Sequence, residues 1–208
     1  MVIDTAATAR TQARYQRIAP FYDRMESLAE RRYHPWRCRL WSLVRGPQVL
    51  EIGVGTGKNL PYYPPHLALI AIDLTPGMLE RARRRAATLG VNVTLQLGDA
   101  QQLDFPDDTF DDVAATFVFC SVPDPVSGLR EAARVLKPGG RLLLLEHMRA
   151  AAPLPGALMD LFNPVVVRVM GANINRRTLE NVQQSGFSLE RVEDVGLGGV
   201  FKLIVARK

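Results

Sequence analysis

The chain has 208 residues, of which 47% are hydrophobic and 23% charged, and this ordinary composition excludes the disordered and fibrous classes. The length suits a single domain whose core is large enough for a full open sheet. The two cysteines, Cys38 and Cys120, lie far apart and outside any CxxC pattern, so we expect neither a metal site nor a disulfide. Residues 1–13 lack the apolar core of a signal peptide, and no run reaches the ~18 apolar residues that span a bilayer.

Residues 1–45 are predicted to form a helical N-terminal arm or lid on a main domain of residues 46–208. The arm holds nine Arg and four acidic residues, which accounts for the whole net charge of +5. Spacings of three and four predict an apolar helical stripe, which consists of Leu28, Ala29, Tyr33, Trp36, Leu40, Leu43 and Val44. Pro20 and Pro35 should break or kink this helix. The basic charge favours an anionic partner, and a solvated helix face is the alternative.

Beyond the arm, short apolar runs alternate with helical stretches. The predicted strands cover residues 49–52, 67–74, 93–97, 113–120, 141–146, 189–195 and 200–206. The predicted helices cover residues 76–89, 127–136 and 178–185. Continuous apolar strands separated by helices indicate a parallel sheet covered on both faces. The last two strands, joined by residues 196–199, indicate a closing antiparallel hairpin.

Residues 150–174 depart from this alternation. They are strongly apolar and are interrupted by Pro153, Pro155 and Pro164. In the inferred topology this segment follows the fifth strand, beside the mouth of the substrate site. It is interpreted either as a lipid-facing surface or as a lid over the cofactor.

A glycine-rich loop, Gly53-Val54-Gly55-Thr56-Gly57, follows the first strand and is predicted to open a helix. Glycines permit a tight turn and let backbone N–H groups approach a ligand closely. The third glycine falls one position earlier than in the dinucleotide fingerprint GxGxxG, and no GK[ST] ending is present. The loop therefore argues against a dinucleotide site and excludes a P-loop.

Three successive strands end in an acidic residue: Glu51, Asp73 and Asp99. In open parallel sheets, ligands bind at the carboxyl ends of the strands, where a carboxylate can accept both hydroxyls of a ribose. Three acids around one ligand suit a sulfonium cation that carries an ammonium group and do not suit a pyrophosphate. The alternative is that Glu51 and Asp99 cap helix N-termini.

With these motifs the sequence resembles the class I S-adenosylmethionine-dependent methyltransferases. Further matching pieces are Ala71-Ile72-Asp73, Pro76-Gly77-Met78-Leu79, Gly98-Asp99-Ala100, Phe105-Pro106 to Phe110-Asp111, and Arg134-Val135-Leu136-Lys137-Pro138-Gly139-Gly140. The resemblance covers residues 15–206. It implies an α/β fold with a Rossmann-like, open, seven-stranded, mostly parallel sheet. It also implies S-adenosyl-L-methionine as the methyl donor and S-adenosyl-L-homocysteine as the product.

The resemblance also implies roles for individual residues. Gly53, Gly55 and Gly57 would face the methionine part, Asp73 the ribose, Met78 an adenine face, and Asp99 with Ala100 the adenine edge. The complete set expected to bind the cofactor is Tyr15, Glu51, Gly53, Gly55, Gly57, Asp73, Leu74, Met78, Asp99, Ala100 and Phe117.

The methyl acceptor is less constrained. The stretch Arg17-Ile18-Ala19-Pro20-Phe21-Tyr22-Asp23 resembles the start of quinone-biosynthesis methyltransferases and of small bacterial phospholipid N-methyltransferases. Cys120-Ser121-Val122, Glu146-His147 and residues 173–187 are also similar to animal membrane-associated thiol methyltransferases. The exit of the fourth strand lacks the Asn/Asp-Pro-Pro-aromatic motif of enzymes that methylate nucleic-acid bases, so nucleic acid is disfavoured.

We therefore expect N-methylation of a phospholipid headgroup amine, of phosphatidylethanolamine type, by a cytoplasmic protein at the surface of an anionic membrane. The alternatives are S-methylation of small thiols, C-methylation of a quinone precursor, and a catalytically silent cofactor-binding module. His147 is the candidate proton acceptor, and Tyr22 is a candidate to close over the cofactor or orient the acceptor. Arg176 and Arg177 are candidates to hold a phosphate. The alternative for each of these residues is a structural role.

Overall fold

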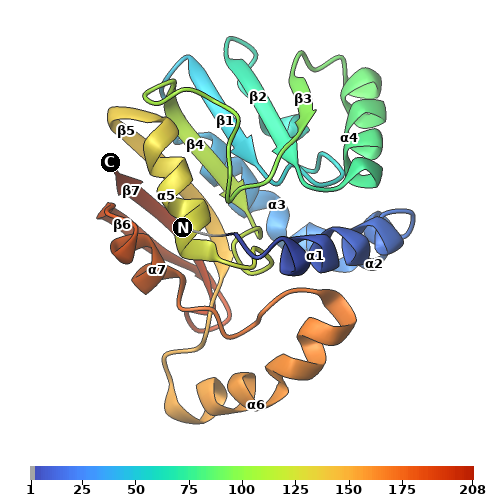
Figure 1. The fold of residues 1–208 in the computed structure, drawn as a ribbon, viewed down its shortest axis with the longest axis vertical. Coiled ribbons are helices and arrows are strands. Elements are labelled where there is room, and N and C mark those ends of the chain that lie inside the picture. The colour runs from blue at the N-terminus through green and yellow to red at the C-terminus, as the bar shows by residue number, and fades with distance from the viewer. Residues whose placement is uncertain (1–2) are drawn as a thin grey trace.

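The computed structural model describes residues 3–208, in which seven strands form one sheet in the order β3-β2-β1-β4-β5-β7-β6 (Figure 1). The strands are β1 (Gln48–Ile52), β2 (Ala68–Asp73), β3 (Thr94–Leu97), β4 (Phe110–Thr116), β5 (Leu136–His147), β6 (Ser188–Gly196) and β7 (Phe201–Arg207). Strands β1 to β5 pair in parallel, whereas β7 pairs antiparallel with β5 and β6. This confirms the predicted Rossmann-like α/β fold with its closing hairpin.

Helices cover both faces of the sheet. They are α1 (Thr5–Ile18), α2 (Tyr22–Met25), α3 (Ser27–Trp41), α4 (Pro76–Leu89), α5 (Pro125–Val135), α6 (Pro153–Met170) and α7 (Thr178–Gln184). One face packs against α5 and α7 and the other against α3 and α4. Helices α1 and α2 cross the edge where the parallel strands end, and α6 projects beyond them (Figure 1). The arm is therefore placed over the edge where ligands bind in such sheets.

Local sequence explains where the core elements begin and end. Helix α4 begins with Pro76, whose missing N–H is not needed in a first turn, and ends at Gly90 in the left-handed conformation (φ 65°). Helix α5 is capped by Asp124, whose side chain accepts from the N–H of Ser127 at 3.0 Å. Strand β4 ends at Thr116, earlier than predicted, because Phe117 adopts φ 58° and turns the chain out of the sheet.

Two expectations about helices were wrong. The glycine loop leads into turns and a short 3-10 helix (Leu60–Tyr62) instead of an α-helix, and prolines at 61, 64 and 65 lack the N–H groups that an α-helix would use. Residues 153–170 form one continuous helix despite their three prolines. Pro153 and Pro155 lie in its first turn, where backbone N–H groups have no intrahelical partner, and only Pro164 lies inside the helix.

The arm is less uniform than the predicted stripe. Leu40 is fully buried in the core with its neighbour Trp41, whereas Leu28 is 82% exposed. Pro35 lies inside α3 without ending it. Arg37, one of the nine arm arginines, is buried and forms an ion pair with Glu30 at 2.7 Å. The positive charge of the arm surface is therefore smaller than the sequence suggests.

Candidate active site

A cavity that is partly open to solvent lies at the carboxyl ends of β1, β2 and β4 and beneath α1 and α2. It is lined by Thr11, Tyr15, Tyr22, Ile52, Gly53, Gly55, Ile72, Asp73, Leu74, Thr75, Met78, Gly98, Asp99, Ala100, Thr116, Phe117, Val118, Ser121, Val122 and Pro123. The cavity thus brings together most residues that the sequence singled out. A carboxyl-end cleft of this kind is the usual ligand site of an open α/β sheet.

The glycine loop forms one wall through Gly53 and Gly55, which have φ 72° and 56°. At Gly55 a β-carbon would meet no atom within 4 Å, so the backbone there faces open space. Gly57 lies outside the cavity lining. A β-carbon on Gly57 would stand 2.5 Å from Cδ1 of Leu60, so this glycine is required by packing within the protein.

Asp73 joins the loops on both sides of the cavity. Its carboxylate accepts hydrogen bonds from the N–H groups of Gly55 at 2.9 Å and Thr75 at 2.8 Å. Burial raises the pKa of this carboxyl above its ordinary value, and the hydrogen bonds from the two N–H groups only partly offset that rise. A carboxylate oxygen accepts more than one hydrogen bond, so Asp73 retains acceptor capacity toward the cavity.

Asp99 lies at the opposite end of the lining, just after β3. Its carboxylate accepts from the backbone N–H of Gln101 at 2.9 Å and from the side-chain amide of Gln101 at 3.2 Å. The hydroxyl of Thr8, on α1, donates a hydrogen bond to the same carboxylate at 3.5 Å. The acid therefore links the sheet edge to the arm, and it caps no helix.

Glu51 does not reach the cavity lining. It is fully buried behind the glycine loop, where Asn59 and Tyr63 donate hydrogen bonds to its two oxygens. Asn59 in turn accepts from Arg37 of α3 at 2.8 Å, so a buried polar chain connects the arm to β1. Burial raises the pKa of the Glu51 carboxyl to about 8.

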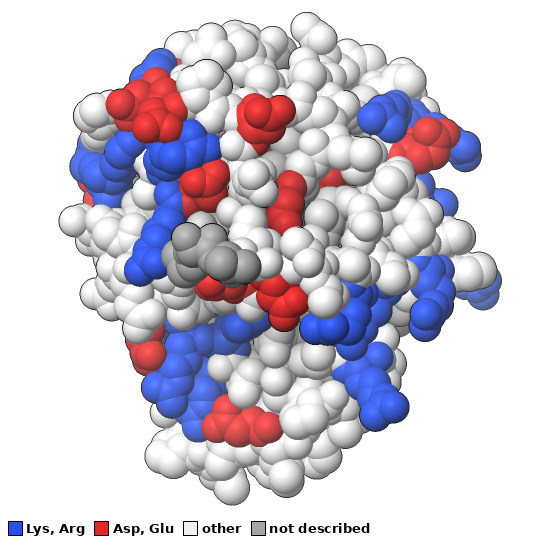
Figure 2. All heavy atoms as spheres, in the orientation of Figure 1, with Lys and Arg blue, Asp and Glu red and all other residues white. Residues whose placement is uncertain are grey.

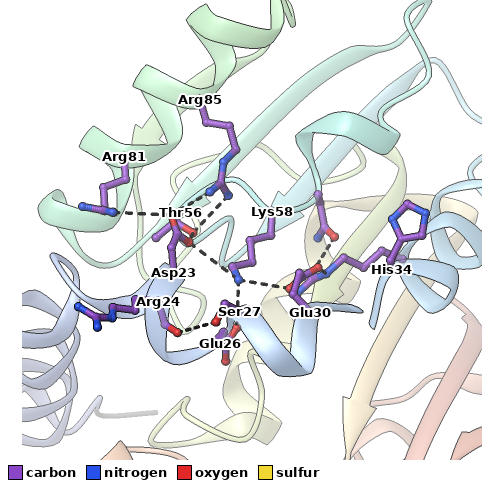
Figure 3. A network of polar contacts seen from close by, with 12 residues as sticks. Asp23, Arg24, Glu26, Ser27, Glu30, His34, Thr56, Lys58, Arg81 and Arg85 are labelled. Atoms are coloured by element: carbon purple, nitrogen blue, oxygen red, sulfur yellow. Dashed lines mark hydrogen bonds and ion pairs between the residues drawn. The ribbon is translucent and has the colours of Figure 1, made fainter. Parts of the chain in front are cut away.

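A cluster around Asp23 fastens the arm over the glycine loop (Figure 3). The Asp23 carboxylate accepts from the hydroxyl of Thr56 at 2.6 Å and from Arg85 of α4 at 2.8 Å. Arg81 and Lys58 approach the same carboxylate at 3.7 and 3.9 Å. The adjacent Tyr22 is thereby held at the cavity wall.

Two tyrosines of the arm line the cavity. The hydroxyl of Tyr15 lies 2.5 Å from the Ser121 hydroxyl, on the loop that follows β4. The rings of Tyr15 and Tyr22 lie 6.5 Å apart. Burial raises the pKa of both phenols, so both are neutral hydrogen-bonding groups at physiological pH.

The predicted catalytic His147 is not in the cavity lining. The centroid of its ring lies 6.4 Å from that of Phe117, in a stacked arrangement, and 6.3 Å from that of Phe201. Phe117, and not His147, lines the cavity. Burial lowers the pKa of His147 to about 4, which keeps the ring neutral. This location is that of a packed aromatic neighbour instead of a group in contact with reactants.

The predicted phosphate pair, Arg176 and Arg177, does not form one fork. Arg176 is half-buried and donates to the carbonyl of Val122 at 2.7 Å. Arg177 is exposed and pairs with Glu180 at 3.3 Å. These adjacent positions before α7 direct their side chains to different surroundings. Neither residue lines the cavity.

The structure adds residues that sequence reasoning missed. Thr11 and Ser121 line the cavity, and Gln12 donates to the carbonyl of Leu74 at 2.8 Å. Ser121 lies in the Cys120-Ser121-Val122 piece that carries the resemblance to thiol methyltransferases, but no motif marks Thr11 or Gln12. Helical spacing offers one signal, because Thr8, Thr11, Gln12 and Tyr15 recur at three- and four-residue intervals on α1.

Comparisons with known proteins agree with this geometry. The family described as a methyltransferase domain matches residues 50–144. A demethylmenaquinone methyltransferase of Deinococcus radiodurans is 35% identical over 171 residues, covering 79% of this chain and 71% of that protein. The chain belongs to the S-adenosylmethionine-dependent methyltransferases. The cofactor is accordingly S-adenosyl-L-methionine, and its product is S-adenosyl-L-homocysteine.

Two further methyltransferases are similar. A phosphatidylethanolamine N-methyltransferase of Cereibacter sphaeroides is 43% identical over 106 residues, which cover 50% of this chain and 52% of that relative. The match thus spans about half the length of this relative. A solved S-adenosylmethionine-dependent methyltransferase from Thermotoga maritima superposes with a TM-score of 0.71 at 25% identity, covering 94% of this chain and 99% of that one.

The cavity fits the cofactor of this family. The retained acceptor capacity of Asp73 suits ribose hydroxyls, and the buried apolar Met78 and Ala100 suit a purine ring. Gly55, whose β-carbon position is open, leaves room for the methionine part. When bound, S-adenosylmethionine supplies an electrophilic methyl group on its sulfonium.

Replacing Asp73 with Ala should weaken S-adenosylmethionine binding by well over ten-fold, because the carboxylate that orders two loops, and that we expect to bond the ribose, is lost. Isothermal titration calorimetry measures the affinity. The exposed Asp104→Ala provides a matched control that should bind normally. Unchanged affinity in the Asp73 variant would contradict the ribose assignment.

Glu51 should make the protein less stable as pH rises. Its folded-state pKa of about 8 lies above its ordinary value of 4.5, so only the folded state holds the proton between these values. This stabilisation is complete below about pH 4.5 and is lost as pH rises through about 8.

The Glu51→Gln variant lacks this titration and should show a flatter melting temperature between these pH values. The comparison with the unsubstituted protein isolates Glu51, because Glu146 and His147 titrate in both proteins. Equal slopes of melting temperature against pH would show that Glu51 does not carry the effect.

Proposed function

We propose that this methyltransferase transfers a methyl group to the headgroup amine of a phospholipid, of phosphatidylethanolamine type, at the surface of an anionic membrane. The observation that carries the proposal is the apolar outer face of α6. Among the described side chains of α6, the large exposed apolar ones are Leu154, Leu158, Leu161, Phe162, Val165 and Val169. Contiguous exposed apolar surface of this kind typically marks a membrane or partner contact.

Helix α6 joins the arm at its C-terminal end. A β-carbon on Gly171, which ends the helix, would lie 3.5 Å from the ring of Tyr15 and 3.6 Å from Arg14. The apolar helix thus ends beside a residue of the cavity wall. This arrangement supports entry of an amphiphilic substrate between α6 and the arm.

Charge around α6 supports an anionic surface. Figure 2 shows a mostly uncharged lower end of the molecule over α6, with basic side chains on both sides of it and an acidic patch between them. Arg168 of α6 and Arg17 of α1 are exposed, and Arg14 is partly exposed. Arginine binds phosphate groups well at a lipid surface. No helix within residues 3–208 combines the length and apolarity needed to cross a bilayer.

The chemistry required is an in-line displacement at the sulfonium methyl, with a neutral thioether as the leaving group. Asp73, Leu74, Met78, Asp99 and Ala100 bind and orient the cofactor in this proposal. Correct alignment of donor and acceptor supplies much of the rate acceleration.

The acceptor nitrogen must carry a free lone pair. An ammonium group that enters a cavity walled by Phe117, Val118 and Tyr22 loses hydration, which lowers its pKa and favours transfer of its proton to water at the open side of the cavity. The hydroxyls of Tyr15 and Ser121 are placed to orient the amine. No cluster of metal-ligating side chains occurs within residues 3–208.

C-methylation of a quinone precursor is the second candidate. It is favoured by the demethylmenaquinone methyltransferase relative, whose match extends over more of this chain than that of the phosphatidylethanolamine relative. A quinone precursor with an apolar tail would use the same α6 surface. A small soluble thiol would not require that surface, and a silent module would methylate none of these acceptors.

The test uses vesicles that contain phosphatidylethanolamine and phosphatidylglycerol, together with methyl-labelled S-adenosylmethionine. Label should appear in the phosphatidylethanolamine and be absent when phosphatidylcholine replaces it. Parallel incubations offer demethylmenaquinone and a small thiol. Label in demethylmenaquinone or the thiol, with none in phosphatidylethanolamine, would contradict the proposal.

The α6 surface is tested by Leu161→Glu, which should lower methylation of vesicle phosphatidylethanolamine by roughly ten-fold or more, because burying a leucine contributes about 1.5–3 kcal/mol. Leu89→Glu, an exposed apolar position at the end of α4, is the matched control and should have little effect. Equal losses in both variants would show that α6 has no special part in lipid methylation.

A further inference from the structure

The loop that leaves β4 forms a large part of the cavity wall. It contributes Phe117, Val118, Ser121, Val122 and Pro123. Phe117 has φ 58°, which is unfavourable for a residue with a side chain. Such a conformation persists only when surrounding contacts hold it in place.

Glu146, near the end of β5, supplies contacts that hold this loop. It is fully buried, and its Oε1 accepts from the N–H of Val118 at 2.8 Å and of Phe119 at 3.0 Å. The N–H of Phe117 itself bonds to the carbonyl of Leu145 at 2.8 Å. Glu146 therefore continues the hydrogen bonding at the point where the β4–β5 ladder ends.

Displacement of this loop would affect both walls of the cavity. The Val118 side chain packs against the glycine loop, since a β-carbon on Gly53 would lie 2.4 Å from Cγ2 of Val118. Ser121 meets the arm at Tyr15. Asn173 fixes the far part of the loop, donating its backbone N–H to the carbonyl of Cys120 at 2.9 Å.

The second oxygen of Glu146 makes no hydrogen bond with any residue of the described chain. Burying a carboxylate with an unused oxygen costs stability, and burial accordingly raises the pKa of Glu146 to about 7. A leucine here would leave the buried N–H groups of Val118 and Phe119 without their acceptor. The acid is therefore better explained by what it holds than by its contribution to stability.

We propose that Glu146 is a positioning residue of the methyl-transfer site: it holds Phe117 and Val118 where they complete the cavity. It acts through the backbone of the loop and touches neither cofactor nor acceptor. The role requires an acceptor oxygen at the correct reach and does not require the negative charge. It is independent of the identity of the methyl acceptor.

Two substitutions separate reach from charge. Glu146→Gln keeps the length of the side chain and one carbonyl oxygen but removes the charge. Glu146→Asp keeps the charge but shortens the side chain by one methylene, which withdraws the oxygen from both N–H groups. Glu180→Asp, an exposed acid on α7, is the matched control.

Affinity for S-adenosylmethionine is measured by calorimetry, and hydrogen exchange is measured over residues 117–122, with the melting temperature as a check of folding. The Asp variant should bind the cofactor roughly ten-fold or more weakly, since the two hydrogen bonds that hold the loop are lost. It should also exchange faster in 117–122 than the unsubstituted protein, while β5 exchange stays unchanged. The Gln variant should bind within about three-fold of the unsubstituted protein.

Normal cofactor affinity in the Asp variant would overturn the proposal. So would a Gln variant that folds but binds as weakly as the Asp variant, because the charge would then be the requirement. Neither outcome depends on phospholipid methylation, so failure here is distinguishable from failure of the proposed substrate.

Discussion

The site depends on one carboxylate at the end of β2. Asp73 accepts backbone hydrogen bonds from Gly55 and Thr75, and so it fixes the glycine loop and the start of α4 relative to each other. Parallel strands bring their carboxyl ends to one edge, which is why a single short side chain can connect both loops. The remaining acceptor capacity of the same group faces the cofactor cavity. The same side chain thus stabilises two loops of the fold and lines the cavity.

The arm makes the cavity a covered site. Asp23 binds the glycine loop through Thr56 and binds α4 through Arg85, while Tyr15 reaches Ser121 on the other side. These contacts are polar and partly solvent-exposed, so each contributes little alone and can open without disrupting the apolar core. We propose that the cofactor occupies the space beneath the arm.

Local patterns made the fold and much of the cofactor site predictable. The glycine loop, the acids at strand ends and the Pro76–Gly90 helix are contiguous signals, and Asp73, Met78 and Asp99 all line the cavity. Side-chain direction was not predictable. Arg176 and Arg177 diverge, and His147 lies behind Phe117, because a single turn or pleat decides which way a residue points.

Contacts between distant segments were equally beyond the sequence. Arg37 appears in a run of basic residues, yet it is buried and donates hydrogen bonds to Glu30 and Asn59. The exposed face of α6 depends on that helix continuing through Pro164 and projecting from the sheet, which neither apolarity nor proline content determines. These tertiary arrangements decide which arginines and leucines remain at the surface to meet a substrate.

Hydrogen exchange with and without S-adenosylmethionine tests the central claim, that the cofactor binds in the cavity beneath the arm. Saturating cofactor should slow exchange in residues 5–25 of the arm as well as in residues 53–57 and 73–78, because the ligand contacts both walls. Protection of the two loops without any change in residues 5–25 would contradict the account of the arm as a cover. An absence of protection in all three segments would contradict the cavity as the cofactor site.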